Sequence, residues 1–408
     1  MQFGLLGRKL GHSYSPQIHS YLADYSYVLF EKNPDEIKDF LRNGDFQGLN
    51  VTIPYKKDVI PYCTELSPRA KQLGAVNTIV RRADGSLIGH NTDYFGFSSM
   101  VQRSKLQVSG KKVLILGSGG SSVTAAAVMK ELGANVVIIS RSGKDNYNNL
   151  QRHSDASVIV NTTPVGMYPN VGISPLDLSL FPNLEGVLDI IYNPAKTKLL
   201  LDAEARGLIA ENGLWMLVAQ AKESAEWFTG TILPDSKISL IHNILRKQME
   251  NIVLIGMPGS GKSTIGKLLA ENTGRQFLDS DAEIVKNVNL TIPEIFDRYQ
   301  ESGFRKFESE VLSDLGKLSG RVIATGGGCV TKEINYHTLH QNGIIVWLQR
   351  DTEELPIDGR PLSMNNDLKK MYSIREPMYR RFADIVIQNN GNPEVVAKTI
   401  LELLSKED

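Results

Sequence analysis

The sequence contains few cysteines, no long apolar segment and no excess of either charge. Its two cysteines, Cys63 and Cys329, lie far apart in 408 residues, which argues against a disulfide framework and for a reducing compartment. No apolar run approaches the roughly 20 residues that span a bilayer, and the first residues show no signal peptide. Basic and acidic residues number 45 each, so a broad surface for nucleic acid or membranes is not expected. We therefore expect a cytoplasmic protein that binds neither.

The composition that remains is that of an ordinary globular protein. With 41% hydrophobic and 22% charged residues, the chain is neither disordered nor fibrous. Its length predicts two or three domains. The sequence carries no indication of an oligomeric state.

The most informative stretch begins at Asn251. An apolar run at Ile252–Ile255 predicts a buried parallel strand, and Thr264–Ala270 has a helical pattern. Between them, GMPGSGKS fits the pattern G-x-x-x-x-G-K-S/T, in which a glycine-rich loop cradles phosphates at a helix N-terminus. Lys262 would reach the β- and γ-phosphates, and the Ser263 hydroxyl would be a ligand of Mg²⁺. The residues expected to bind ATP are Gly259, Ser260, Gly261, Lys262, Ser263 and Thr264. The alternative is a glycine-rich turn that binds nothing.

The first 105 residues alternate between short strands and helices, with polar residues at the strand ends. Ser13 and Ser15 flank a turn before a helix at Pro16–Leu22, where they could hold a carboxylate or cap the helix. Lys56 follows a strand predicted over 46–54, and a lysine there could transfer a proton or be a solvated side chain. Asp93 could orient Lys56 or cap a helix.

Four segments of this region resemble the successive motifs of shikimate dehydrogenases. They are Gly7-x-x-Leu10-x-His12-Ser13-x-Ser15-Pro16-x-x-His19, Gly48-x-Asn50-Val-Thr52-Ile-Pro54-x-Lys56, Gly74-Ala75-Val-Asn77-Thr78 and Gly89-x-Asn91-Thr92-Asp93-x-x-Gly96. The resemblance implies that Lys56 and Asp93 are the proton-transfer pair. It also implies that shikimate or 3-dehydroshikimate is held by Ser13, Ser15, Thr52, Asn77 and Asp93 and, further along the chain, by Tyr192 and Gln220.

Residues 106–205 predict a dinucleotide-binding domain. A buried strand enters the glycine loop Gly117-Ser-Gly119-Gly120, and a helix and a second strand ending at Ser140 follow. The third glycine of the fingerprint is replaced by Ser122, so the motif is imperfect. After the second strand, Arg141 and Lys144 suit a 2′-phosphate, which indicates NADP, whereas the alternative is a basic surface turn. The residues expected to bind NADP are Gly117, Ser118, Gly119, Gly120, Ser121, Arg141, Lys144 and Gly213.

The last 150 residues resemble shikimate kinases. The motifs after the phosphate loop are Asp279-x-Asp281, Phe304-Arg305-x-x-Glu308, Gly326-Gly327-Gly328, Arg360-Pro361-Leu362 and Arg375-x-x-x-Tyr379. The D-x-D spacing at a strand end suits Asp279 for Mg²⁺ through water and Asp281 for the proton of the substrate hydroxyl. The resemblance implies that Arg360 closes over the phosphates from a short lid at 351–362. It implies that shikimate is bound by Asp281, Arg305, Gly327, Gly328 and Arg375.

We therefore predict an α/β protein with three domains. An α/β substrate domain (1–105, completed by helices at about 206–248) and a Rossmann NADP domain (106–205) precede a P-loop kinase domain with a parallel sheet (251–408). The predicted function is NADPH-dependent reduction of 3-dehydroshikimate to shikimate, followed by ATP- and Mg²⁺-dependent phosphorylation to shikimate 3-phosphate. The alternatives are that one half is catalytically silent, or that a quinate or shikimate dehydrogenase is joined to another small-molecule kinase.

Overall fold

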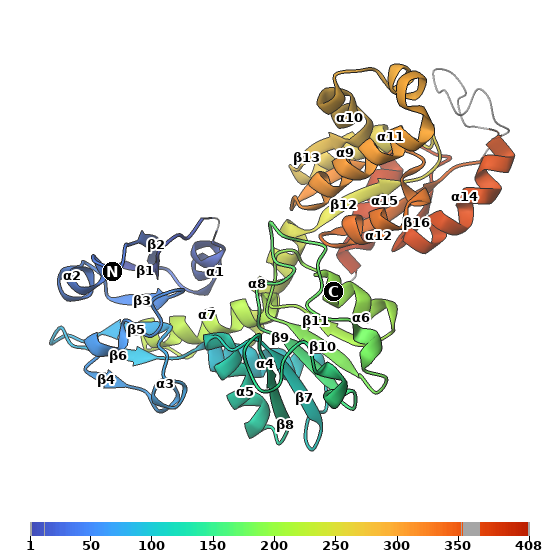
Figure 1. The fold of residues 1–408 in the computed structure, drawn as a ribbon. Helices are drawn as coiled ribbons and strands as arrows, with labels where there is room; N and C mark the ends of the chain where they lie inside the picture. The colour runs from blue at the N-terminus through green and yellow to red at the C-terminus, as the bar shows by residue number, and fades with distance from the viewer. Residues whose placement is uncertain (1, 12, 352, 354–367, 407–408) are drawn as a thin grey trace. The chain divides into compact units, whose positions relative to one another are not determined.

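The structure is a computed structural model that describes residues 2–11, 13–351, 353 and 368–406 (Figure 1). The chain divides into two compact units. The first comprises Met1–Val165, Ser174–Tyr192 and Asp202–Ile244, and the second comprises Gly166–Ile173, Asn193–Leu201 and Leu245–Asp408. Each unit is built around parallel strands, as the sequence predicted.

The first sheet of the first unit has six strands in the order β2-β1-β3-β5-β6-β4. Strands β1, β2 and β3 are parallel to one another, and β5 runs antiparallel to both β3 and β6. The strands are β1 (Gln2–Gly7), β2 (Ser26–Glu31), β3 (Gly48–Val51), β4 (Glu65–Leu66), β5 (Thr78–Arg81) and β6 (Leu87–His90). The helices between them are α1 (Ser15–Leu22), α2 (Ile37–Asn43) and α3 (Pro68–Leu73).

Strand β3 is shorter than the predicted strand at 46–54. Thr52 N–H still bonds Leu6 O of the neighbouring strand β1, but the chain turns after it, because Tyr55 N–H bonds to Thr52 O. Pro54 has no N–H to continue a ladder. The strand therefore ends early, and Lys56 lies beyond a turn at the carboxyl end of β3.

The second sheet of the first unit is fully parallel, in the order β11-β10-β9-β7-β8. Its strand order reverses between β7 and β9, which is the point where doubly wound folds bind nucleotides. The strands are β7 (Lys112–Leu116), β8 (Asn135–Ile139), β9 (Val158–Asn161), β10 (Gly186–Asp189) and β11 (Ile209–Glu211). The helices are α4 (Asp93–Ser104), α5 (Gly120–Glu131) and α6 (Lys198–Ala205).

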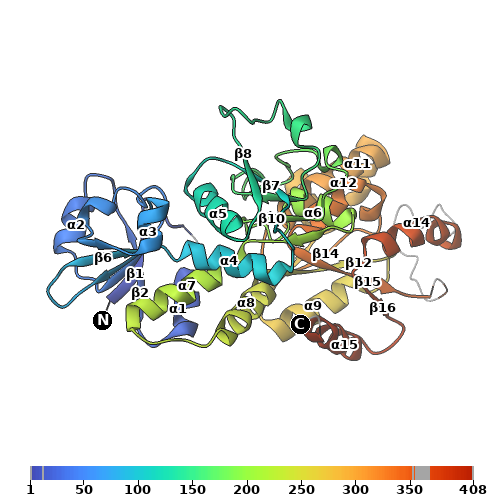
Figure 2. The same ribbon diagram turned by 90° about the horizontal axis from the view of Figure 1, so that it is seen from below.

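Two helices follow β11: α7 (Leu214–Thr229) and α8 (Ser236–Met249). Helix α7 packs against α1, α4 and β5, so it touches elements that are far from it in sequence. Figure 2 shows α4 and α7 side by side. Gly96 of α4 allows this approach, because a Cβ there would lie 2.7 Å from Met216 O and 2.9 Å from Gln220 Cβ. The crossing brings Gln220 next to the beginning of α4.

The second unit contains a five-stranded parallel sheet in the order β13-β14-β12-β15-β16. The strands are β12 (Asn251–Ile255), β13 (Gln276–Asp279), β14 (Arg321–Ala324), β15 (Gly343–Gln349) and β16 (Ile385–Gln388). The helices are α9 (Lys262–Thr273), α10 (Ser280–Val288), α11 (Ile292–Gly316), α12 (Glu333–His340), α14 (Leu368–Phe382) and α15 (Pro393–Lys406). Helix α11 breaks at Gln300, whose φ is +61°.

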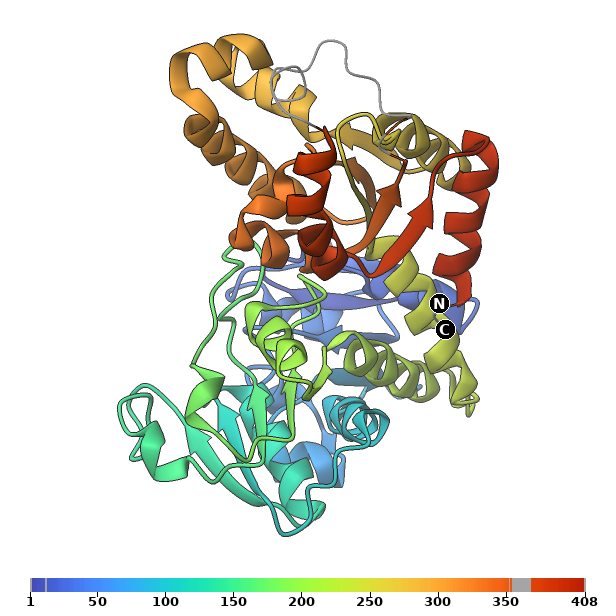
Figure 3. The same cartoon turned by 90° about the vertical axis from the view of Figure 1, so that its right-hand side faces the viewer.

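Both faces of this sheet are covered by helices (Figure 3). Along β12, Val253 and Ile255 join one apolar core, whereas Ile252 and Leu254 join the other, as expected from the alternation of side chains in a strand. Because both faces are buried, the strand reads as a continuous apolar run in the sequence.

Among the described residues, no helix is both long and apolar enough to cross a membrane.

Candidate active sites

The first site is built around an ion pair between Lys56 and Asp93. Lys56 Nζ lies 2.5 Å from Asp93 Oδ2, and the two side chains are only 25% and 14% exposed. Asp93 is the first residue of α4, so its carboxylate also lies near the positive end of a helix. Lys56 is therefore not simply a solvated side chain. Asp93 can hold the Lys56 ammonium group in place as a proton donor for the carbonyl group of a bound substrate.

Asn77 and Gln220 lie beside the same pair. The Asn77 carboxamide accepts a hydrogen bond from Thr92 N–H (2.7 Å) and donates to Thr92 Oγ1 (3.0 Å). Thr92 Oγ1 also lies 3.4 Å from Gln220 Oε1. Thr92 immediately precedes Asp93, so these contacts bring two predicted substrate ligands to the start of α4.

The predicted ligands near the N-terminus surround a turn. Ser13 Oγ accepts from Ser15 N–H at 3.2 Å, and the N-cap residue of α1 is Tyr14, which makes no side-chain capping bond. The Tyr14 ring meets the Tyr192 ring edge-on at 6.2 Å, and burial raises the pKa of Tyr192. Tyr192 therefore lies next to the turn that carries Ser13 and Ser15. Thr52 packs against Gly7, where a Cβ would lie 2.8 Å from Thr52 Cγ2.

Helix α7 also brings a second carboxyl group, that of Glu223, close to the pair. Glu223 is largely buried, and its Oε2 atom has no hydrogen-bond partner among the described residues. Burial raises the pKa of Glu223 to about 8; Glu226 and Asp93 act in the same direction, and Lys222 opposes them. At neutral pH this carboxyl group is therefore largely protonated.

The glycine loop after β7 lies where the strand order reverses. Gly119 is the N-cap of α5, and a Cβ at Gly119 or Gly120 would meet no atom within 4 Å, so the loop has open space beside it. Ser122 is 1% exposed and donates to Gly117 O at 2.7 Å. The serine in the third fingerprint position thus holds the loop together, and the loop and helix terminus fit a pyrophosphate. Ser118 lies in the same loop, Ser121 lies in the first turn of α5, and Gly213 is the N-cap of α7.

The loop after β8 favours a phosphate over a ribose hydroxyl. Arg141 and Lys144 are both exposed there. The single acidic residue between 141 and 149, Asp145, pairs with His153 Nε2 at 3.0 Å. No carboxylate of this loop is therefore left to accept from a 2′-hydroxyl, and the two cations fit a 2′-phosphate.

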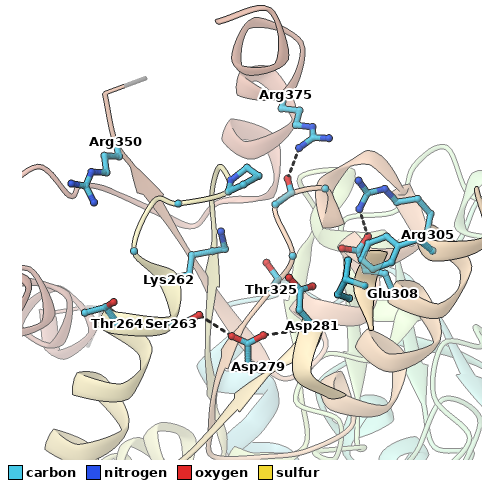
Figure 4. Close-up of a pocket in the computed structure, with 18 of the residues that line it drawn as sticks. Lys262, Ser263, Thr264, Asp279, Asp281, Arg305, Glu308, Thr325, Arg350 and Arg375 are labelled. Carbon is cyan, nitrogen blue, oxygen red and sulfur yellow. Dashed lines mark hydrogen bonds and ion pairs between the residues drawn. The ribbon is translucent and has the colours of Figure 1, made fainter. Parts of the chain in front are cut away.

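The second site is a cavity of about 560 Å³ at the carboxyl ends of β12, β13 and β14 (Figure 4). Its walls include the loop before α9, in which Gly259 and Gly261 have φ of +85° and +89°. Lys262 Nζ donates to Gly256 O and Met257 O, both at 2.9 Å. The loop, the helix N-terminus and a lysine that is 8% exposed fit the phosphates of a nucleotide. Lining residues that the sequence had assigned to ATP are Gly259, Gly261, Lys262, Ser263 and Thr264, whereas Ser260 is fully buried below them.

Ser263 and Asp279 form the candidate magnesium site. Ser263 Oγ donates to Asp279 Oδ2 at 2.8 Å, while Asp279 Oδ1 caps α10 by accepting from Asp281 N–H at 3.0 Å. The part of the chain that is described has no cluster of three or more His, Cys, Asp or Glu for a metal ion. Mg²⁺ typically uses one or two protein ligands together with substrate phosphates, so this pair fits it.

Two arginines flank the glycine run at the other end of the cavity. Arg375 Nη1 donates to Gly327 O at 3.3 Å, and Tyr379 Oη donates to the same oxygen. A Cβ at Gly328 would lie 2.0 Å from Arg305 Nη2, so only glycine leaves room for that guanidinium. Figure 4 shows both arginines, with Asp281, around one space. Two guanidinium groups beside exposed backbone fit a small carboxylate.

Arg305 is itself held by two carboxylates. Nη1 lies 2.7 Å from Glu308 Oε2, which is fully buried, and Nη2 lies 3.1 Å from Glu301 Oε1, which is half exposed. Burial alone would lower the pKa of Arg305, but Glu308 and Glu301 together more than offset it, so the pKa is raised. The i,i+3 spacing that the sequence showed thus becomes a buried ion pair.

Some residues of the sites were not predicted as ligands. Arg350 lines the cavity directly after β15, on the side of the phosphate loop (Figure 4). A lone arginine after an apolar strand gave no signal in the sequence. Arg360, in contrast, was predicted from the sequence and lies outside the described residues, as does most of the predicted lid at 351–362.

These features define two classes of enzyme in one chain. The first unit has the two-sheet arrangement, glycine loop and lysine–aspartate pair of a dinucleotide-dependent dehydrogenase, and the second has the phosphate loop and parallel sheet of a small-molecule kinase.

Known families confirm both classes. Residues 5–79 match the shikimate dehydrogenase substrate binding domain, and residues 258–405 match shikimate kinase. A shikimate dehydrogenase (NADP(+)) of Clostridium perfringens is 36% identical over 250 residues, which cover 56% of this chain and 92% of the relative.

Solved structures agree with the sequence relatives. A shikimate dehydrogenase of Peptoclostridium difficile covers 60% of this chain and 97% of its own, with 39% identity and a TM-score of 0.55. A shikimate 5-dehydrogenase of Thermus thermophilus, solved with NADP(H) and shikimate, covers 60% and 99%, with 28% identity and a TM-score of 0.55.

The chain belongs to the shikimate dehydrogenase family and continues into a shikimate kinase domain. The predicted fusion of two enzymes of the shikimate pathway is confirmed.

Proposed function

We propose that the first unit reduces 3-dehydroshikimate to shikimate with NADPH, and that the second unit phosphorylates shikimate with MgATP. The first product is the second substrate, so the two reactions form a sequence. What supports this most is the presence in one chain of the Lys56–Asp93 pair and of a phosphate-loop cavity that two arginines line.

In the first reaction, Lys56 supplies the proton. The glycine loop before α5 and the loop that carries Arg141 would hold NADPH, which would supply a hydride for the carbonyl carbon. The carbonyl oxygen gains negative charge as the hydride arrives, and Lys56 Nζ donates a proton to it. Asp93 orients the lysine, and Ser13, Ser15, Thr52, Asn77, Tyr192 and Gln220 hold the substrate. This set is complete within the first unit.

In the second reaction, Asp281 accepts the proton of the 3-hydroxyl group of shikimate while the oxygen of that hydroxyl group attacks the γ-phosphorus of ATP, and the bond between this phosphorus and the oxygen that leaves with ADP breaks. Arg305 and Arg375 clamp the substrate carboxylate, with Gly327 and Gly328 between them. Lys262 stabilises charge on the transferring phosphoryl group. Mg²⁺, held by Ser263 and through water by Asp279, would neutralise phosphate charge. For Arg360 the role over the phosphates rests on the sequence alone.

We further propose the three-domain division given above and a cytoplasmic protein whose partners are small molecules. Quinate with NAD is the weaker alternative for the first site, because Arg141 and Lys144 favour a 2′-phosphate.

A coupled assay tests the proposal. Purified protein is supplied with 3-dehydroshikimate, NADPH and MgATP, and shikimate 3-phosphate is the expected product. Lys56→Ala should lower NADPH oxidation by about 10²- to 10⁴-fold and leave ADP formation from added shikimate unchanged. Lys262→Ala should do the reverse. If either variant stopped both reactions in a folded protein, two independent sites would be the wrong description.

A further inference from the structure

Helix α7 carries a buried serine, Ser224, whose hydroxyl group meets three polar side chains of other elements. Ser224 is 0% exposed. Its Oγ lies 2.7 Å from Asn50 Nδ2, 2.9 Å from Thr78 Oγ1 and 3.0 Å from Thr92 Oγ1. No motif pointed to this residue, and helix propensity does not require a serine there.

The sheet topology explains why these partners meet. Asn50 at the end of β3 pairs with Thr78 at the start of β5, and Thr78 pairs with His90 at the end of β6. The chain leaves β6 through Asn91 and Thr92 into α4. All three partners of Ser224 therefore lie at one edge of the sheet, and α7 crosses that edge.

The directions of the hydrogen bonds follow from the number of protons. Ser224 has one hydroxyl proton, which it donates to Gln220 O at 2.9 Å. The Asn50 oxygen accepts from Tyr27 Oη at 2.8 Å, so its amide group is turned to donate to Ser224. The second lone pair of Ser224 is then left for a threonine hydroxyl. Ser224 thus uses both its donor and its acceptors.

Each branch of this network leads to a residue of the proposed dehydroshikimate site. Thr92 carries the adjacent Asp93 and bonds Asn77 in both directions. Gln220 lies one helical turn before Ser224. A shift at Ser224 would therefore move the orienting carboxylate and two substrate ligands together.

We propose that Ser224 is a positioning residue for the dehydrogenase reaction, which fixes Thr92–Asp93, Asn77 and Gln220 relative to one another and touches no substrate itself. The inference rests on the proposed function of the first unit. The one donor and two acceptor positions of Ser224 must be satisfied at once, because an unpaired polar group in this interior is costly. Ser224 therefore holds the residues bonded to it in a single arrangement.

The test removes the hydroxyl and separates its effect from the rest of the chain. Ser224→Ala should lower kcat/KM for 3-dehydroshikimate by roughly 10- to 100-fold, the effect of a small misplacement of reacting groups. The KM for NADPH and the phosphorylation of added shikimate should stay unchanged. Thr78→Val removes another hydroxyl of the same network and should give the same pattern. Because Ser224 and Thr78 act through one network, the fold-loss of kcat/KM in the double variant should be smaller than the product of the fold-losses in the two single variants.

Ser104→Ala is the matched control. Ser104 is also buried in the first unit and bonds a carbonyl of its own helix, Val101 O, but belongs to no site. It should leave all rates unchanged. If Ser224→Ala does not fold, the kcat/KM of Thr78→Val alone tests the inference.

The inference is overturned if the folded variants keep kcat/KM within about two-fold of the parent protein, or if they lose stability without a loss of rate. If the parent protein itself does not reduce 3-dehydroshikimate, the proposed function fails instead. The two failures are thus distinguishable.

Discussion

Glu223 should make the first unit less stable as the pH rises, and Glu223→Gln should remove that dependence. The pKa of this carboxyl group is about 8 in the folded protein, against an ordinary value of 4.5. Between these values the folded state keeps a proton that the unfolded state has released. The folded state therefore binds more protons, and the free energy of unfolding falls as the pH rises through this range.

The size of the effect follows from the shift. One pKa unit corresponds to about 1.4 kcal/mol, so raising the pH from 5.5 to 8.5 should cost on the order of 3 kcal/mol through Glu223. Glutamine has nearly the same shape and cannot ionise. The advantage of Glu223→Gln over the parent protein should therefore grow by about that amount between the two pH values.

Urea unfolding at pH 5.5 and pH 8.5 measures this difference. The three tryptophans are Trp215, Trp227 and Trp347, and the first two lie in the first unit. In a Trp347→Phe background the emission therefore follows the first unit alone. Glu131→Gln in the same unit is the control, because the hydrogen bond from Arg69 lowers the pKa of Glu131, so no such advantage should develop between the two pH values. Equal pH dependence of the parent protein and Glu223→Gln would refute the reasoning.

Three further predictions concern ligands. Arg141→Ala should reduce the preference for NADPH over NADH roughly 10- to 100-fold, since a charged hydrogen bond is worth about 1.5–3 kcal/mol. The ratio of kcat/KM for NADPH to kcat/KM for NADH measures this preference, and an unchanged ratio would mean that other residues set it. Asp279→Asn keeps the oxygen that caps α10 but removes the negative charge beside Ser263. It should therefore raise the Mg²⁺ concentration needed for half-maximal phosphorylation by about 10- to 100-fold. A Mg²⁺ titration that matches that of the parent protein would contradict the assigned site. Glu301→Gln removes the half-exposed ion pair on one side of Arg305, which is worth about 0.3–0.5 kcal/mol. The KM for shikimate should therefore fall by up to about two-fold. A higher KM would mean that Glu301 helps to hold Arg305 in place.

The sequence was sufficient for elements whose signal is local. Ile252–Ile255 was predicted as a strand because both faces of β12 are buried, and β12 spans Asn251–Ile255. The turn between β5 and β6 contains Asp84-Gly85, a pair that favours hairpins, and Ser86 N–H bonds Asp84 Oδ1 at 2.9 Å. In these cases neighbouring residues alone decide the conformation.

The residues that escaped prediction depend on distant partners. Ser224 and Glu223 lie on a helix whose pattern predicts only which side is apolar, and the side chains that Ser224 contacts are more than a hundred residues away. Nothing in the sequence near Glu223 indicates burial, so its raised pKa had no signal. Arg350 belongs to the cavity only because β15 lies beside β12. The predicted strand at 46–54 was too long because a turn, in which Tyr55 N–H bonds Thr52 O, ends it before Pro54.

The packing of α7 against α1 and β5 has a consequence for folding during synthesis. The ribosome makes α7 roughly 190 residues after α1, which takes about 10 to 40 s at the usual rates. Until then the edge formed by Asn50, Thr78 and Thr92 lacks Ser224, and its polar groups face water. The reductase site can therefore close only when α7 has left the ribosome, shortly before the phosphate loop follows. A nascent chain arrested before α7 has left the ribosome should bind chaperones more strongly than a chain arrested after α7 has left it.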